Sequence, residues 1–427
     1  MASDSVDDGG GSARIARAAV APGAVALTWE DETTSTFHHA WLRDHCPQSV
    51  HPVSNQREVA LSTVPPDLAP ASVTVEERSG GRQALCVRWP ASADPTGAEH
   101  VSSFDGEWLR GNCYSRTAST AARARDESPS GAGVRLWGGA GAGFGDLLRV
   151  PVAWADIERG GADGEGVLRL LEMLHETGVG LVSGVPASME ATEQLARTLA
   201  PVHETLYGGM WDVGTREESE VIDTAYSSVE LPLHTDGTYL TQQPGLQLFN
   251  CVAQAPPRPG RPLDGATRLV DGLALAAKLA AEAPEAFGFF CRAALPFEHT
   301  DDGTGTHLRH VGPVFQLHPL SGEAVGVRWN ETDRGAINTL SFDDVGAFYA
   351  HARTLQAALD ALETSIRLQP GEAIITDNHR VMHGRHAFVG QRRLIGCYLH
   401  ADDWRSRWRV LRAAAGGKVP VTMRRGV

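Results

Sequence analysis

The hydrophobic pattern divides the chain into a β-rich first part and a mixed second part. Short apolar or alternating runs, bounded by glycine, proline and polar residues, predict strands at 25–29 and 84–89. The stretch that follows is rich in alanine, glycine, serine and arginine and has little periodicity, which is typical of a linker. The pattern therefore predicts a disordered tail at 1–20, a small β-rich domain at 21–115, a linker at 116–150, a larger domain at 151–415 and a C-terminal tail at 416–427.

Helical and strand patterns alternate in the larger domain. Apolar residues recur at helical spacing from Val167 to Leu174, and Gly178 stands where a C-terminal cap is expected. Many short strands with a few helices predict a mainly β fold, a sandwich or jelly roll whose metal-binding member is the double-stranded β-helix. Further helices are predicted at 189–199 and 343–362, and strands at 179–183, 245–252, 267–270, 325–329, 372–376 and 394–399.

Composition limits the classes of partner. The 427 residues carry a formal net charge of -14, which argues against nucleic acid or an anionic membrane as the main partner. No apolar run approaches the roughly 20 residues that span a bilayer. The acidic, glycine-rich start does not resemble a targeting segment, and the six scattered cysteines suggest reduced thiols. We therefore expect a cytoplasmic protein without a membrane partner.

One stretch, at 231–239, has the composition of a metal site. His234 and Asp236 are separated by one residue, so an extended backbone would place both side chains on one face. A distant histidine would complete the two-His-one-carboxylate face of non-haem Fe(II) oxygenases. Other His-x-Asp triplets begin at His299 and His400. Spacing alone does not choose among the candidates for the third ligand, which are His379, His383 and His386.

Two further groups accompany this stretch. Tyr207, Trp211 and Tyr226 lie just upstream, and they would either pack in the core or form an aromatic cage for a quaternary ammonium ion. Arg392 and Thr267 open predicted strands. A guanidinium with a hydroxyl group is suited to binding the distal carboxylate of a 2-oxoacid, because the arginine fork donates two hydrogen bonds.

The small domain has its own candidate metal ligands. Cys46, His51 and His100 could bind a structural zinc ion together with a fourth donor. The alternative is an ordinary loop with a cysteine near two histidines.

Motifs along most of the chain, over 29–411, resemble those of the γ-butyrobetaine/trimethyllysine hydroxylases. These are Fe(II)- and 2-oxoglutarate-dependent dioxygenases of the taurine-dioxygenase-like superfamily, with a double-stranded β-helix. The resemblance implies iron on His234, Asp236 and His383. It rests on Trp-Leu-Arg-Asp-x-Cys at 41–46, Tyr-Gly-x-x-Trp at 207–211, Asp-Thr-Ala-Tyr at 223–226, His-Thr-Asp at 234–236, Leu-Val-Asp-Gly at 269–272 and Asp-Asn-x-Arg-Val-x-His-Gly-Arg at 377–385.

The resemblance also implies the binding residues. Arg392 and Thr267 would hold 2-oxoglutarate. The family's cage maps onto Tyr207, Trp211 and Tyr226, with Tyr398 close to the same pocket.

The substrate prediction depends on Asp223. The butyrobetaine branch tends to carry asparagine here, whereas an aspartate can pair with an α-ammonium group. Asn330 is the candidate for the substrate carboxylate.

The resemblance predicts C3 hydroxylation of Nε-trimethyllysine, with 2-oxoglutarate and dioxygen as cosubstrates, by a homodimer. The alternatives are hydroxylation of γ-butyrobetaine or another small trimethylammonium compound, and a non-catalytic metal-binding scaffold. The family's zinc ligands are a Cys-x-Cys-x-x-Cys run and a later histidine. Here the run reads Cys46, Gln48 and His51, followed by His100, so zinc is either lost or bound by a substituted set of ligands.

Overall fold

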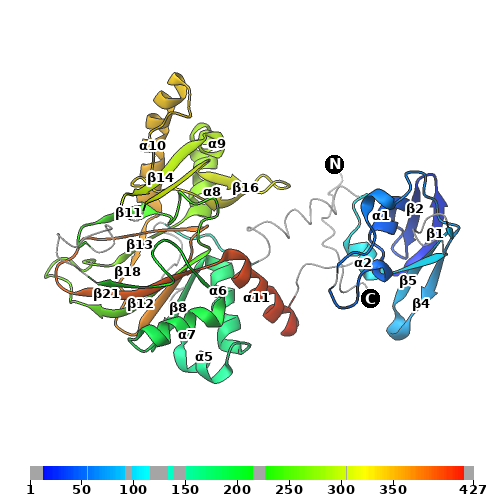
Figure 1. Cartoon of the computed structure of the whole chain (residues 1–427), viewed down its shortest axis with the longest axis horizontal. Coiled ribbons are helices and arrows are strands. Elements are labelled where there is room, and N and C mark those ends of the chain that lie inside the picture. The colour runs from blue at the N-terminus through cyan, green and yellow to red at the C-terminus, as the bar shows by residue number, and fades with distance from the viewer. Residues whose placement is uncertain are drawn as a thin grey trace. The chain divides into compact units, whose positions relative to one another are not determined.

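The chain folds into two compact units. They comprise Met1–Glu127 with Pro420–Val427, and Ser128–Val419. The division between Glu127 and Ser128 falls inside the predicted linker. Figure 1 shows the arrangement of elements within each unit. The computed structural model describes residues 13–54, 56–91, 99–115, 133–138, 150–214, 227–303 and 305–417.

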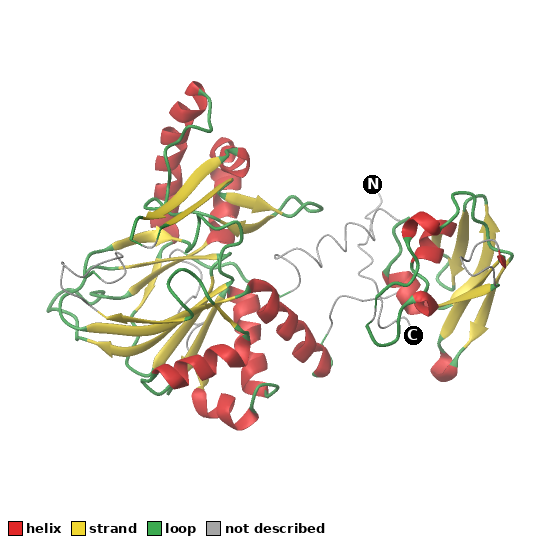
Figure 2. Cartoon of the chain, in the orientation of Figure 1, coloured by secondary structure: helices red, strands yellow, loops and turns green. Residues whose placement is uncertain are grey.

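The first unit consists of two three-stranded antiparallel sheets (Figure 2). Leu27, Trp29, Phe37 and Trp89 are almost completely buried in its apolar core. The predicted strands at 25–29 and 84–89 are confirmed as β2 and β5. The sheets comprise β1 (Ile15–Ala21), β2 (Ala24–Trp29) and β3 (Thr34–His38), and β4 (Ser72–Glu77), β5 (Gln83–Trp89) and β6 (His100–Asp105), with short helices α1 (His39–Asp44) and α2 (Gly106–Gly111).

The predicted N-terminal tail extends too far. Residues 15–20 belong to strand β1, which pairs with β2 from Ile15 opposite Trp29 to Ala21 opposite Ala24. Ile15 is buried, so this strand contributes to the core instead of remaining outside it. The acidic, glycine-rich composition that suggested a tail ends before this strand begins.

The second unit is built around two facing sheets. The larger sheet has the strand order β10-β21-β12-β19-β8-β7, with β9 also paired to β21, and the smaller has the order β11-β20-β13-β18. Its strands are β7 (Val152–Ala153), β8 (Val179–Ser183), β9 (Val202–His203), β10 (Met210–Gly214), β11 (Leu231–His234), β12 (Leu246–Gln254), β13 (Thr267–Asp271), β18 (Thr364–Ile366), β19 (Glu372–Asp377), β20 (Val381–Arg385) and β21 (Arg392–Leu399), with hairpins β14 (Leu295–Asp301)–β15 (Thr306–Gly312) and β16 (Phe315–Leu317)–β17 (Ala324–Val327).

Helices cover this sheet pair in two groups. Helices α5, α6, α7 and α11 share an apolar cluster with the larger sheet, and α8, α9 and α10 pack around the two hairpins. The mainly β fold with helices, a double-stranded β-helix, is confirmed. The helices are α5 (Trp154–Gly160), α6 (Glu165–Thr177), α7 (Met189–Leu199), α8 (Gly272–Glu282), α9 (Pro284–Arg292), α10 (Phe342–Leu362) and α11 (Ala401–Ala414).

A short piece of the predicted linker, residues 133–138, packs against the rest of the second unit. Trp137 is buried, and its indole Nε1 donates a hydrogen bond to the Thr177 carbonyl oxygen over 2.6 Å. Its backbone N–H donates to Asp271 Oδ2 (3.2 Å), the carboxylate that also forms a buried ion pair with Arg380 at 2.8 Å. This segment therefore helps to anchor the turn between β19 and β20, which precedes the strand of a predicted ligand.

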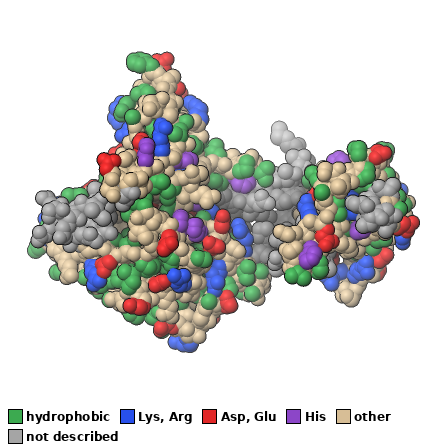
Figure 3. All heavy atoms as spheres, viewed as in Figure 1, with side chains coloured by type: hydrophobic (Ala, Val, Ile, Leu, Met, Phe, Trp, Pro, Cys, Tyr) green, Lys and Arg blue, Asp and Glu red, His purple; other side chains and the backbone are tan. Residues whose placement is uncertain are grey.

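None of the described helices is long and apolar enough to cross a bilayer. On the face of the second unit drawn in Figure 3, acidic and basic side chains are interspersed.

Candidate active site

A cavity of about 190 Å³ lies between the two sheets of the second unit. Strands β10, β12, β19 and β21 of the larger sheet line one side, and β11, β13 and β20 of the smaller sheet line the other. Its described lining is Tyr207, Trp211, Val213, Leu231, Pro232, His234, Asp236, Gly237, Tyr239, Gln247, Phe249, Thr267, Asn330, Thr332, Asp333, Ile374, Thr376, His383, Gly384, Arg385, Arg392, Leu394 and Tyr398.

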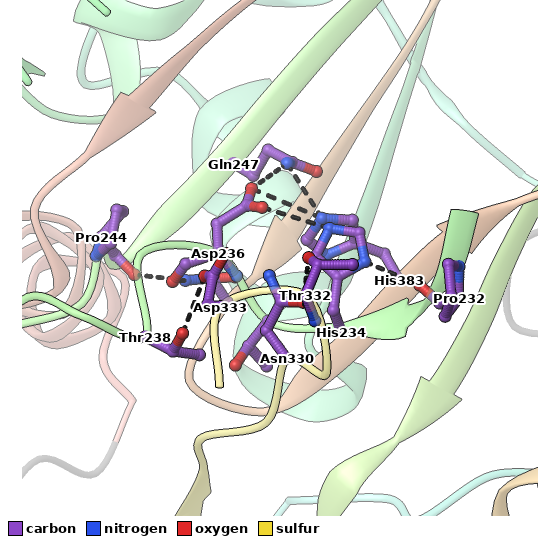
Figure 4. A network of polar contacts seen from close by, with 12 residues as sticks. Pro232, His234, Asp236, Thr238, Pro244, Gln247, Asn330, Thr332, Asp333 and His383 are labelled. Carbon is purple, nitrogen blue, oxygen red and sulfur yellow. Dashed lines mark hydrogen bonds and ion pairs between the residues drawn. The ribbon is translucent and has the colours of Figure 1, made fainter. Parts of the chain in front are cut away.

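The three predicted iron ligands meet in this cavity (Figure 4). His234 ends β11 and is the register partner of His383 on β20. Asp236 Oδ1 lies 3.3 Å from His234 Nε2, and Asp236 Oδ2 lies 3.4 Å from His383 Nε2. Among the described residues, these three form the only group of three or more His, Cys, Asp or Glu side chains whose ligand atoms lie within 4.8 Å of one another.

The expectation of an extended backbone from His234 through Asp236 is wrong. The strand does not continue through Asp236, because β11 ends at His234 and the aspartate lies in the following turn. Gly237 adopts a φ of 63°, a left-handed conformation that glycine adopts without steric cost. The two side chains converge because of this turn and not because of strand alternation.

The donor atoms suit a divalent metal ion. His234 Nδ1 lies 2.7 Å from the Pro232 carbonyl oxygen, so a proton on Nδ1 can donate there, and Nε2, which faces Asp236, can bind a metal ion in place of a proton. Burial opposes ionisation of Asp236, but His383 and His234 outweigh it and hold the pKa of this carboxyl group well below its usual value. A carboxylate with two imidazole nitrogens on one face is the donor set of non-haem iron sites.

Two amide side chains that were not predicted from the sequence support this arrangement. The buried amide of Asn378 accepts from Asp236 N–H (2.8 Å) and donates to the Asp236 carbonyl oxygen (3.0 Å). The amide of Gln247, on β12, contacts Asp236 Oδ2 and lies 3.0 Å from His383 Nε2. The backbone and the carboxylate of Asp236 are therefore both held in place.

The cavity contains a buried cation. Arg392, at the start of β21, is 7% exposed, and burial lowers its pKa to about 10, which leaves it charged at neutral pH. Thr267, at the start of β13, lines the same cavity. The predicted pair thus shares one chamber with the metal ligands, and a buried guanidinium there is complementary to an anionic ligand.

Aromatic side chains form another wall. Trp211 and Tyr398, on the neighbouring strands β10 and β21, contact each other edge to face, with ring centroids 4.3 Å apart. Phe249 on β12 adds a ring with its centroid 6.1 Å from that of Trp211. The hydroxyl group of Tyr207 lies 3.1 Å from that of Tyr239. Phe249 and Tyr239 were not predicted as site residues. Phe249 lies two residues after Gln247 on β12, so the two side chains point to the same face of the strand.

The predicted polar contacts at the substrate end fall partly within the described residues. Asn330 lines the cavity and is 9% exposed. Its Oδ1 accepts hydrogen bonds from the backbone N–H (3.0 Å) and hydroxyl group (2.7 Å) of Thr332, which leaves the Nδ2 group available to a ligand. Asp223 and Tyr226 lie outside the described residues.

The competing histidines have other neighbours. His299 packs against Tyr239, with ring centroids 5.0 Å apart, and His400 stacks on His203 at 3.8 Å. His379 Nε2 lies 3.1 Å from a backbone carbonyl oxygen, and His386 Nε2 lies 3.0 Å from the Ser365 hydroxyl group. Of the three His-x-Asp triplets, the one at His234 is therefore combined with a third metal ligand.

The predicted zinc site is incomplete. Cys46 Sγ lies 3.0 Å from His100 Nε2 and 3.4 Å from Gln48 Oε1. Gln48 Oε1 also accepts from the Ser103 N–H (2.8 Å), so it serves as a hydrogen-bond acceptor. His51 is exposed, and its Nδ1 accepts backbone hydrogen bonds from the next turn. A structural zinc takes four ligands, and the described donors provide only the pair Cys46 and His100, so they do not fit.

Comparisons with known proteins agree with this geometry. Residues 156–398 match the model of the taurine catabolism dioxygenase TauD, TfdA family, and 17–97 match a γ-butyrobetaine hydroxylase-like N-terminal domain. The chain is 32% identical to rat mitochondrial trimethyllysine dioxygenase, covering 89% of this chain and 83% of the relative. It is 29% identical to γ-butyrobetaine dioxygenase of Pseudomonas sp. strain AK-1, covering 93% and 96%. The chain therefore belongs to the TauD/TfdA family of Fe(II)- and 2-oxoglutarate-dependent dioxygenases.

Proposed function

We propose that the protein hydroxylates Nε-trimethyllysine at C3. The observation that carries this proposal is a single cavity containing the His234, Asp236 and His383 triad, the buried Arg392 and the Trp211–Tyr398 pair. The similarity to trimethyllysine dioxygenases over most of both chains supports the choice of substrate.

The roles of the side chains follow from their chemistry. His234, Asp236 and His383 would hold Fe(II), whose chemistry with 2-oxoglutarate and dioxygen replaces a C–H by C–OH and releases succinate and carbon dioxide. Arg392 would bind the distal 2-oxoglutarate carboxylate, with Thr267 as a second donor.

The substrate would be held at both ends. The faces of Tyr207, Trp211 and Tyr398 attract the trimethylammonium group, at about 0.5–2 kcal/mol per contact. Asn330 Nδ2 would donate to the substrate carboxylate. Tyr226 and Asp223 are proposed from the sequence as a further cage residue and a partner for the α-ammonium group. Fixing both ends determines which carbon approaches the metal.

γ-Butyrobetaine is the second candidate. The similarity to the Pseudomonas γ-butyrobetaine dioxygenase, at 29% identity over nearly the whole of both chains, favours it. The two substrates share a trimethylammonium group and a carboxylate, so the aromatic wall and Asn330 suit both. They differ in chain length and in the α-ammonium group.

Succinate release by purified protein with Fe(II), 2-oxoglutarate and each candidate substrate tests the proposal. We expect succinate release to depend on the added substrate and to be faster with trimethyllysine than with γ-butyrobetaine. If the protein turned over γ-butyrobetaine but not trimethyllysine, the substrate assignment would be refuted. A protein that binds Fe(II) but never decarboxylates 2-oxoglutarate would instead indicate a metal-binding scaffold. Light scattering in the same buffer tests the homodimer, which we propose from the family resemblance.

A further inference from the structure

The turn after Trp329 is held in fixed register with the metal ligands. Thr235 N–H donates to the Trp329 carbonyl oxygen (2.8 Å), and Trp329 N–H donates to Thr235 Oγ1 (3.1 Å). Thr235 stands between His234 and Asp236. The next residues along the turn include Asn330, Thr332 and Asp333, all of which line the cavity (Figure 4).

Asp333 is the only carboxylate, apart from the metal ligand Asp236, among the described residues that line the cavity. Its Oδ2 accepts a hydrogen bond from the Thr238 hydroxyl group over 2.8 Å. Its backbone carbonyl oxygen accepts from the Glu298 N–H over 2.7 Å. These two contacts hold the side chain and the main chain, so the carboxylate faces the cavity from a fixed position.

No lysine or arginine among the described residues forms an ion pair with Asp333. The adjacent Arg334 instead places its guanidinium 5.2 Å from the ring centroid of Phe348. Burial, reinforced by the charge of Asp236 and offset in part by the Thr238 hydrogen bond, His234 and His299, raises the pKa of Asp333 to about 6. A partly buried carboxylate that forms no ion pair with a lysine or arginine is costly, and a ligand carrying a positive charge would relieve that cost.

Neither of the two arginines in the described lining of the cavity, Arg385 and Arg392, forms an ion pair with Asp333. Arg385 donates hydrogen bonds to the carbonyl oxygens of Ser227 and Val229, both over 2.8 Å. Arg392 starts β21 in the larger sheet, whereas Asp333 belongs to the turn beside His234. The cavity therefore combines a cationic group suited to 2-oxoglutarate with a separate carboxylate suited to a substrate ammonium group.

We propose that Asp333 is a specificity-determining residue that receives the α-ammonium group of the substrate, while Asn330, three residues earlier, donates to the α-carboxylate. A single turn would then bind both charges of an amino-acid zwitterion. The inference rests on the proposed function and deepens it. Asp333 would select an amino acid over a substrate that lacks the α-ammonium group. Asp223, proposed above from the sequence as a partner for the same ammonium group, is left unchanged in the experiments below.

The variant Asp333→Asn tests this inference, because the amide oxygen can still accept from Thr238 while the charge is lost. The substrates are trimethyllysine and its deamino analogue, which keeps the chain length, carboxylate and trimethylammonium group. For trimethyllysine we expect kcat/KM to fall on the order of 10- to 100-fold, mainly through KM, since a hydrogen bond between two charges is lost. We expect the kinetic constants for the analogue, and the 2-oxoglutarate KM, to change by less than about 3-fold.

Glu331→Gln is the matched control, because Glu331 is an exposed carboxylate of the same turn and does not line the cavity. This variant should leave the kinetic constants for both substrates unchanged. Equal losses for the two substrates in Asp333→Asn would overturn the inference and indicate a structural or trimethylammonium-facing role.

The wild-type enzyme provides a test that does not depend on folding of the variant. It should prefer trimethyllysine to the deamino analogue by at least about 10-fold, and a ratio near one would overturn the inference. Should Asp333→Asn not fold, Asp333→Ser provides the same comparison. If wild type turns over neither compound, the proposed function itself fails, which is distinguishable from failure of the inference alone.

Discussion

Replacing Asn378 with alanine should weaken metal binding at a site whose three ligands are all unchanged. The side chain is fully buried, accepts from Asp236 N–H over 2.8 Å, and donates to the carbonyl oxygens of Asp236 and Pro244, both over 3.0 Å. It is therefore the direct link between the turn that carries Asp236 and the segment that leads to His383.

The magnitude follows from the groups left without partners. The Asp236 carbonyl oxygen keeps a second donor, Gln243 Nε2 at 3.1 Å, but Asp236 N–H and the Pro244 carbonyl oxygen lose their partner. Each buried unsatisfied group costs about 1–3 kcal/mol, so the free energy of unfolding should fall by about 2–6 kcal/mol. Loss of an outer partner of a metal ligand typically lowers metal affinity about 10- to 100-fold.

The assay is calorimetric titration of metal-free protein with Mn²⁺, well below the unfolding temperature, alongside denaturant unfolding. Asn250→Ala is the control, because that buried amide donates to Pro186 (2.9 Å) and Thr192 (3.0 Å) and does not line the cavity. Both variants should lose stability, but only Asn378→Ala should lose Mn²⁺ affinity. Equal Mn²⁺ dissociation constants for the two variants would refute the positioning role.

Three further outcomes follow from the site and from the small domain. Arg392→Met should raise the KM for 2-oxoglutarate at least about 10-fold, because a charge-assisted contact is lost; steady-state succinate release measures this, and an unchanged KM would contradict the assigned role. Trp211→Leu should raise the KM for trimethyllysine about 2- to 30-fold while sparing 2-oxoglutarate, since one cage face is removed; equal effects on both KM values would argue against a cage. Elemental analysis should find well below one zinc per chain, because the described residues offer only Cys46 and His100 of the four ligands that a structural zinc takes, whereas stoichiometric zinc would contradict that interpretation.

Periodic elements were predictable from the sequence. The helical spacing from Val167 to Leu174 corresponds to α6, and Gly178 forms its cap with a φ of 76°. The strand predicted at 372–376 is β19. These elements have one buried face or a short apolar run, so local sequence carries the signal.

Strand β20, which carries His383, was missed for a physical reason. All five of its residues are buried, so Val-Met-His-Gly-Arg shows neither alternation nor a continuous apolar run. Its buried polar side chains, His383 and Arg385, line the cavity and contact residues that are distant in the sequence. The choice of His383 among three histidines accordingly came from family resemblance and not from spacing.

The missed site residues illustrate the same limit. Asn378 acts on Asp236, which lies 142 positions away, and no local pattern indicates that pairing. Asp333 stands out only once the fold places it in the cavity without a cationic partner. Gln247 and Phe249 could have been recognised, because they lie two positions apart in a predicted strand and therefore share the face of β12 that lines the cavity.

A competition experiment tests the central claim most directly. Trimethyllysine and γ-butyrobetaine are mixed at equal concentrations with wild-type protein, Fe(II) and 2-oxoglutarate, and the two hydroxylated products are quantified by mass spectrometry. Their initial ratio equals the ratio of the two kcat/KM values. We predict a ratio of at least about 10 in favour of hydroxytrimethyllysine, consistent with one charged contact to the α-ammonium group. An excess of hydroxylated butyrobetaine would contradict the substrate assignment.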